Sequence, residues 1–190
     1  MHISMTYINI VLLSVVLLSA CATQESALDK QPSQRDIEKS LKETSESDFQ
    51  TYREAITLLG NGELDKAEAA LLDFSEDKPG LAGPWAHLAL INIKRNKLDK
   101  AEAFVQKALQ RNPQMPQAFN LLGYIEKSRG NITKAREHYT RAVELNNNYA
   151  IAHYNLALIY DIYIQDIPKA IAHYQKYMTL TKNKDKRTAD

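Results

Sequence analysis

Few residues of this sequence are of the types that perform covalent or metal chemistry. There is one cysteine, Cys21, so neither an intramolecular disulfide nor a paired-cysteine zinc pattern can form. No two of the five histidines have the HExxH spacing of a zinc site, and no Gly-rich phosphate loop or nucleophile elbow occurs. The sequence therefore predicts no catalytic residues, no metal and no cofactor, and we do not expect an enzyme.

Cys21 follows a segment with the properties of a secretory signal. Residues 8–20, INIVLLSVVLLSA, form an apolar run that is shorter than the roughly 20 residues of a transmembrane helix. A short apolar run that ends in small residues predicts a signal peptide, here residues 1–20. Leu18 to Cys21 resemble the lipobox of bacterial lipoproteins, which implies that diacylglycerol alkylates the Cys21 thiol. The alternative is that Cys21 is an ordinary small residue in an uncleaved anchor helix.

The residues after Cys21 bear on where the protein resides. Ala22 stands where an inner-membrane lipoprotein carries aspartate, so the resemblance implies the outer membrane, with the protein facing the periplasm. Residues 21–47 comprise the lipidated cysteine and a polar stretch that predicts a flexible linker, with an end-to-end distance of roughly 30 Å. The 24 Lys and Arg balance 23 Asp and Glu, which gives no indication of nucleic-acid binding.

From Asp48 onward the sequence repeats itself at a nearly constant interval. One alanine recurs in four aligned segments at intervals of 34, 34 and 35 residues, at Ala67, Ala101, Ala135 and Ala170. Unit four therefore carries one extra residue. A second series of small residues holds another common place, at Ala55, Ala89, Gly123 and Ala157. Small residues let two helices approach closely, so the pattern predicts repeated helix pairs.

In this interval and these residues the chain resembles the tetratricopeptide repeat (TPR) family, whose period is 34 residues. The resemblance covers residues 48–182 and implies an all-α fold, a right-handed α-solenoid of about four helix-turn-helix repeats. The repeats are expected at 48–81, 82–115, 116–149 and 150–182. The basic tail at 183–190 is expected to be disordered.

The resemblance also implies where a partner binds. First-helix side chains of TPR units line a concave groove that accepts an extended peptide or a helix. We call the matching positions of this chain the predicted groove residues, and they are Tyr52, Lys94, Gln117, Asn120, Tyr124, Lys127, Tyr154 and Asp161. Rigid aromatic rings and amide groups suit recognition because they give contact at low entropic cost.

Three histidines share places with residues of other units. His138 and His173 hold the same place in units three and four, so they can lie near each other along the stack, and we expect solvated imidazoles there rather than a metal site. His153 shares the register of Trp85 and Phe119. We expect His153 to pack as a substitute for these aromatic residues.

These patterns predict a lipid-anchored adaptor that binds protein partners in the bacterial envelope. The chain resembles the TPR lipoproteins of type IV pilus assembly, which help a secretin ring to form. Alternatives of the same class are an adaptor for peptidoglycan hydrolases and an accessory protein of a TonB system. An alternative of another class is a self-assembling structural envelope protein, because the outer face of the last helix, with Ile171, Tyr174 and Met178, can stay exposed. The sequence leaves the oligomeric state open.

Overall fold

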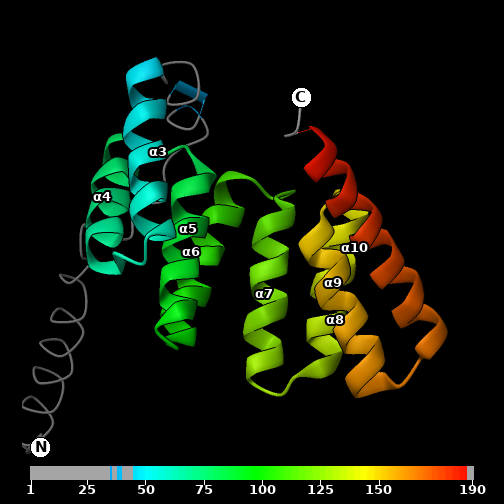
Figure 1. Ribbon diagram of the computed structural model, residues 1–190. Helices are drawn as coiled ribbons and strands as arrows, with labels where there is room; N and C mark the ends of the chain where they lie inside the picture. The colour runs from blue at the N-terminus through cyan, green and yellow to red at the C-terminus, as the bar shows by residue number, and fades with distance from the viewer. Residues whose placement is uncertain (1–34, 36–37, 40–44, 188–190) are drawn as a thin grey trace, which may run out of the picture. The chain divides into compact units, whose positions relative to one another are not determined.

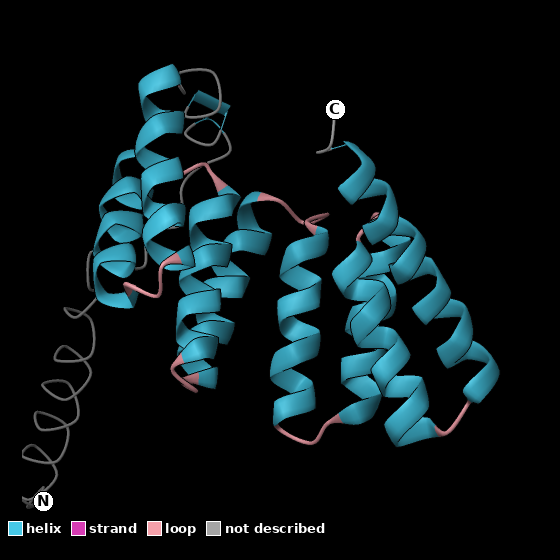
Figure 2. Ribbon diagram, in the orientation of Figure 1, coloured by secondary structure: helices cyan, strands magenta, loops and turns pink. Residues whose placement is uncertain are grey.

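The computed structural model describes residues 35, 38–39 and 45–187, all within the unit formed by residues 34–190. Among the described residues there are eight α-helices and one π-helix and no strand, and successive helices run up and down (Figures 1 and 2). They are α3 (Glu46–Gly60), α4 (Leu64–Asp77), α5 (Ala82–Lys94), α6 (Leu98–Arg111), α7 (Pro116–Ser128), α8 (Ile132–Leu145), α9 (Ala150–Leu158), η1 (Ile159–Ile164) and α10 (Ile167–Arg187). The predicted all-α solenoid is confirmed.

The predicted signal peptide, the lipidation site Cys21 and most of the predicted linker lie outside the described residues. Within the part of the chain that the structure describes, no helix combines the length and the apolar character needed to cross a membrane.

Each predicted unit is one helix pair: α3 with α4, α5 with α6, α7 with α8, and α9 with α10. The repeated alanines of the second helices lie in the centre of these pairs and are at most 2% exposed. The small residues of the first helices are buried as well, at Ala55, Ala89, Gly123 and Ala157. The pairs pack through the residues that recur in the sequence, so the periodicity reports helix-helix contact.

The turn inside each pair also repeats. One of its residues has a positive φ in every unit, at Gly62 (82°), Asn96 (56°), Gly130 (83°) and Gln165 (61°). Glycine adopts this left-handed conformation without steric cost, and asparagine tolerates it better than other residues do. In the first three units the next residue donates its backbone N–H to the carbonyl five residues earlier, as Lys97 does to Asn92 at 2.8 Å.

The extra residue of unit four lies in the π-helix η1. Here Asp166 donates to the carbonyl of Tyr160, six residues earlier, at 2.9 Å. A π-helix closes its hydrogen bonds over one residue more than an α-helix, so it absorbs a single insertion without ending the helix. It also leaves Ile162, Tyr163 and Ile164 exposed, at 59%, 49% and 38%.

The hydrophobic core consists of two clusters of buried residues. One cluster extends from Ala55 to Ile125, and the other includes Tyr139 and Leu156. Gly123 of α7 lies against the ring of Tyr139 on α8, where an added Cβ would be 2.6 Å from the nearest ring carbons. The Tyr139 side chain is fully buried, and its hydroxyl has no hydrogen-bond partner.

Both ends of the repeat domain differ from the predicted boundaries. Ser45 caps α3 in a reciprocal arrangement with Asp48, so the first helix begins at Glu46 rather than at residue 48. Helix α10 continues to Arg187, whereas we expected the repeat domain to end at residue 182 and a disordered tail to follow. The prediction was wrong here because residues 181–187 contain neither glycine nor proline to end the helix.

Candidate partner-binding surface

The predicted groove residues lie on the first helices of the pairs and on η1, and they differ in exposure. Lys94 and Gln117 are exposed, on α5 and α7. Tyr124 of α7 and Tyr154 of α9 are 40% and 39% exposed, which is high for tyrosine side chains of a folded domain. These four side chains are available to a partner without any change in the fold.

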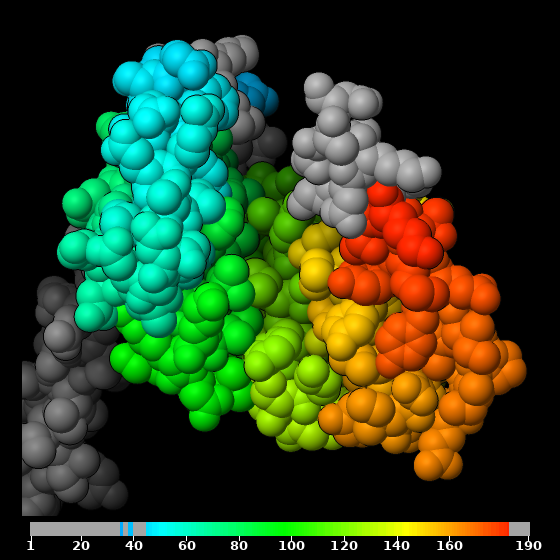
Figure 3. Space-filling view, in the orientation of Figure 1, coloured from blue at the N-terminus to red at the C-terminus, as the bar shows by residue number. Residues whose placement is uncertain are grey.

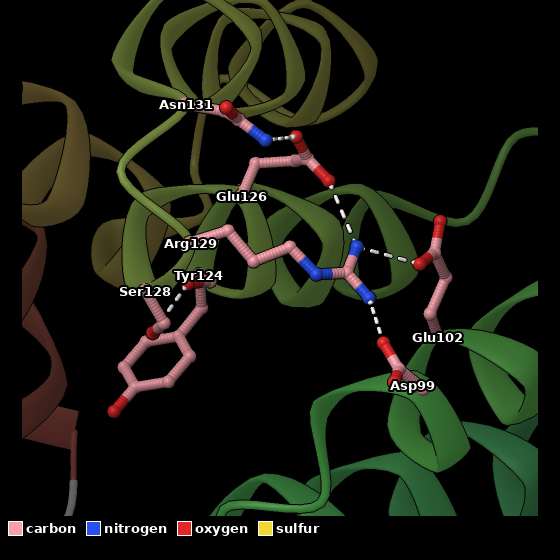
Figure 4. A network of polar contacts seen from close by, with 7 residues as sticks. All are labelled: Asp99, Glu102, Tyr124, Glu126, Ser128, Arg129 and Asn131. Carbon is pink, nitrogen blue, oxygen red and sulfur yellow. Dashed lines mark hydrogen bonds and ion pairs between the residues drawn. The ribbon is translucent and has the colours of Figure 1, made fainter.

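Tyr124 and Lys127 form a local pair on α7. The Lys127 ammonium lies 5.0 Å from the centre of the Tyr124 ring, within the range of a cation–π contact. The Ser128 hydroxyl donates to the Tyr124 carbonyl at 2.9 Å and completes the last turn of the helix. Figure 4 shows the Tyr124 ring pointing away from the polar network of Arg129. The pair therefore presents an aromatic face and a positive charge to its surroundings.

The network beside this pair fixes unit three to unit two. Arg129, just after α7, donates to Asp99 and Glu102 of α6 at 2.6 Å each and to Glu126 at 3.1 Å (Figure 4). Asn131 donates to the other oxygen of Glu126 at 2.9 Å. These hydrogen bonds raise the pKa of Arg129 further above its ordinary value. We call this arrangement the arginine clamp.

The arginine clamp occurs also one repeat earlier. Arg95 donates to Asp65 and Glu68, and Lys100 adds a hydrogen bond to Glu68 at 2.9 Å. Burial would raise the pKa of Glu68, but the hydrogen bonds from Lys100 and Arg95 lower it to about 2. The charged residues of the turns thus hold neighbouring repeats in register, and they position the first helices that carry the exposed side chains.

Three predicted groove residues have intramolecular partners. Asn120 is only 7% exposed and accepts a hydrogen bond from the Asn155 amide at 2.9 Å, so its prediction as an accessible binding residue is wrong. A buried amide requires such a partner, and the neighbouring first helix supplies it. Tyr52 is half-buried and lies 2.7 Å from the His87 ring nitrogen. Asp161 accepts from the Tyr174 hydroxyl at 3.1 Å.

A pair of rings joins the two helices of each of the last three units. The pairs are Trp85 with Phe104, Phe119 with His138, and His153 with His173, at centroid distances of 6.0, 6.4 and 5.2 Å. The expectation that His138 and His173 lie near each other is not supported by these contacts, since each packs on the first helix of its own unit. His153 is 4% exposed and does substitute for the aromatic residues of its register. The sequence signal for these pairs is their separation of 19 or 20 residues.

The His153–His173 contact has a defined proton arrangement. His153 Nε2 lies 3.1 Å from the Asn147 carbonyl and must donate to it. In the neutral imidazole the Nδ1 atom of His153 then accepts, so His173 Nδ1, at 2.9 Å, donates to it. Burial, in the first place, lowers the pKa of both histidines, and the Lys176 charge lowers that of His153 further.

Acidification is therefore expected to destabilise unit four. Because the folded-state pKa values lie below the ordinary 6.5, the unfolded chain binds more protons, and the free energy of unfolding falls as the pH drops below 6.5. Urea unfolding at pH 7.5 and at pH 5.5 measures this loss. The variant His153→Phe copies the Phe119 of unit three and should show a smaller loss. An equal loss in the variant would show that other groups cause it.

The described residues contain no cluster of three or more His, Cys, Asp or Glu side chains that could hold a metal ion. The features that they do contain are repeated helix pairs, charged clamps between repeats and exposed tyrosines on the first helices.

These features define an α-solenoid of TPR-like helical repeats. The family described as "Tetratricopeptide repeat protein 21 C-terminal ARM domain" matches residues 73–183, more than half of the chain, and the chain belongs to this family. None of the curated proteins matches the sequence significantly.

Solved structures of similar fold include three TPR-like proteins. "MamA 41-end from Desulfovibrio magneticus RS-1" is 20% identical, with a TM-score of 0.56 over 71% of this chain and 76% of that chain. A thermophilic TPR protein of Thermus thermophilus is 19% identical, with a TM-score of 0.61 over 70% and 74% of the two chains. A chain of the APC/C hetero-tetramer Cut9-Hcn1 is 20% identical, with a TM-score of 0.62 over 68% of this chain and 26% of its own. At these identities the likeness is one of fold.

Proposed function

We propose that this protein is a lipid-anchored scaffold of the bacterial envelope, which binds partner proteins through the first helices of its repeats. TPR-like repeats generally serve protein-protein interaction, and the membership of this chain in the family supports that role. The anchoring part of the proposal rests on Cys21 and the signal-like residues before it. The proposed place is the periplasmic side of the outer membrane, in the assembly of a pilus or secretin machine.

The observation that carries the binding proposal is the pair of Tyr124 and Lys127. Tyrosine supplies rigid contact area and a hydroxyl, and it is enriched where proteins recognise one another. The nearby ammonium adds attraction for a carboxylate or for the acidic side chains of a partner. Tyr154 on the next first helix extends the aromatic surface, so a partner that contacts both helices meets two tyrosines and a cation.

Replacing both Tyr124 and Lys127 with alanine is expected to abolish co-purification of the partner after crosslinking in membranes. Both side chains lie on the surface of α7 and outside the core clusters, so the helicity measured by circular dichroism should not change. The matched control replaces Tyr163 and Lys66, which are an exposed tyrosine and an exposed lysine outside the predicted groove residues. Capture by the double variant at the level of the unchanged protein would exclude this surface.

The same crosslinking experiment tests the envelope part of the proposal. Mass spectrometry of the captured proteins is expected to identify a pilus or secretin component, whereas a peptidoglycan hydrolase or a TonB-system protein would favour one of the alternatives. A Cys21→Ser chain is the control for anchoring and is expected to leave the membrane fraction. If it stays there, lipidation does not hold the protein.

A further inference from the structure

The last repeat ends in an aromatic platform that also occurs in the first repeat. Tyr154 of α9 lies on Tyr177 of α10 with a centroid distance of 5.1 Å. In unit one, Tyr52 stacks on Phe74 at 5.3 Å, and the repeat register makes these two residues the equivalents of Tyr154 and Tyr177. Two repeats have thus built the same pair of rings at the side that faces the following repeat.

In unit one the structure shows what covers this pair. Helix α5 places Gly83 against Tyr52 so closely that an added Cβ would lie 2.5 Å from the tyrosine hydroxyl oxygen. Four residues later, His87 places its ring nitrogen 2.7 Å from the same hydroxyl. The covering helix therefore offers a residue without a side chain where the ring must fit, and a hydrogen-bonding side chain one turn further on.

In unit four the equivalent positions are open. Tyr154 is 39% exposed, and no helix after α10 covers it in the described part of the chain. Ile167 is 49% exposed, whereas Leu64, Leu98 and Ile132 at its place are partly buried against the core. Figure 3 shows side chains of α9 and α10, yellow-orange to red, at the surface of this end.

Two more apolar residues follow Ile167 along the same face of α10. Met178 is 47% exposed, whereas Leu109 and Val143 at its place pack against the core. Ile171 is 49% exposed and takes the place at which the first two repeats carry the glutamates of the arginine clamp. The spacing of four and seven residues puts all three on one side of the helix. We call Tyr154, Tyr177, Ile167, Ile171 and Met178 the terminal platform.

We propose that the terminal platform is a docking site for an amphipathic α-helix of a partner protein, seated as α5 is seated on unit one. That helix carries glycine at the point facing Tyr154 and a hydrogen-bonding side chain four residues later. It carries an apolar residue where Arg95 and Arg129 stand, because Ile171 replaces the glutamate that an arginine would need. This inference rests on the proposed scaffold function and names the class of partner.

A second copy of this chain does not fit the platform in the same way. Its first helix, α3, has Phe49 in the place of Gly83 and Arg53 in the place of His87. A phenylalanine cannot occupy a position at which even a Cβ would meet the tyrosine hydroxyl. The platform therefore selects a helix of different sequence and disfavours head-to-tail association of identical chains.

The test uses a fluorescent peptide that copies residues 81–96, which contain α5, with lysines appended for solubility. We expect it to bind the full chain in anisotropy titrations, and we expect Tyr154→Ala or Ile171→Glu to weaken binding at least tenfold. Ile162→Glu, which alters an equally apolar and exposed isoleucine outside the platform, should leave binding unchanged. A peptide with phenylalanine in place of Gly83 should also bind at least tenfold more weakly.

Two results would overturn the inference. One is a peptide that fails to bind, or that binds the Ile171→Glu chain as well as the original. The other is a sedimentation profile in which the full chain dimerises and Ile171→Glu restores the monomer, because the occupant would then be a second copy. Neither result touches the capture experiment with Tyr124 and Lys127, so a failure here is distinguishable from a failure of the proposed function.

Discussion

Replacing Gly123 with alanine is expected to lower the free energy of unfolding by about 2 kcal/mol. The new methyl group would lie 2.6 Å from ring carbons of Tyr139, a fully buried side chain that has no room to move aside. Overpacking of a core costs about 1–3 kcal/mol, and the gain in helix propensity, at most about 1 kcal/mol, offsets only part of this cost. Urea unfolding followed by circular dichroism measures the difference.

The chain supplies the control for this prediction. Unit two carries Ala89 and Val105 at the same two places, both fully buried. A double variant with alanine at 123 and valine at 139 copies that pair, and it should be more stable than the same two changes added separately. Tyr139→Phe should be close to neutral because the hydroxyl has no hydrogen-bond partner. Additive losses in the double variant would mean that the ring does not set the requirement for glycine.

Arg129→Ala is expected to cost about 2 kcal/mol of stability, which lies between exposed and buried ion pairs. The guanidinium joins three carboxylates, and the Glu126 side chain is only 9% exposed. Without the arginine, that carboxylate keeps the Asn131 amide as its hydrogen-bond donor and loses its charged partner. The loss is measured by urea unfolding at pH 7.

An exposed ion pair serves as the comparison. Lys66 contacts Glu63 at 2.7 Å with 73% of its side chain exposed, so Lys66→Ala should cost less than about 0.5 kcal/mol. A double-mutant cycle between Arg129 and Glu102 should give a coupling energy of about 1 kcal/mol. A loss at Arg129 no larger than that at Lys66 would mean that the arginine clamp does not stabilise the junction.

The helix pairs could be predicted from the sequence because the packing positions recur. Ala67 and Ala101 lie 34 residues apart, and close helix contact demands a small residue at that place in every unit. The extra residue of unit four is visible as an interval of 35. Its absorption by a π-helix could not be predicted, since an insertion can also lengthen a turn.

The side-chain partners were harder to predict because they depend on which helix comes next in space. Asn120 has a polar side chain on a first helix, which is typical of a binding residue, but its place faces the following first helix, where Asn155 bonds to it. The period aligns His173 with His138 along the stack, although the pairing across one unit is the one that recurs. Residues spaced by one period reveal the repeat, whereas contacts inside a unit have spacings that the period does not show.

The clamps join units one to two and two to three, and α8 carries Thr133 and Arg136 where α6 carries Asp99 and Glu102. The junction before α9 therefore relies on packing and on the amide bond between Asn120 and Asn155. In a linear array each seam opens with its own probability. Hydrogen exchange should thus be fastest in α9 and α10, and a ligand that spans this seam would act as a fastener and slow it.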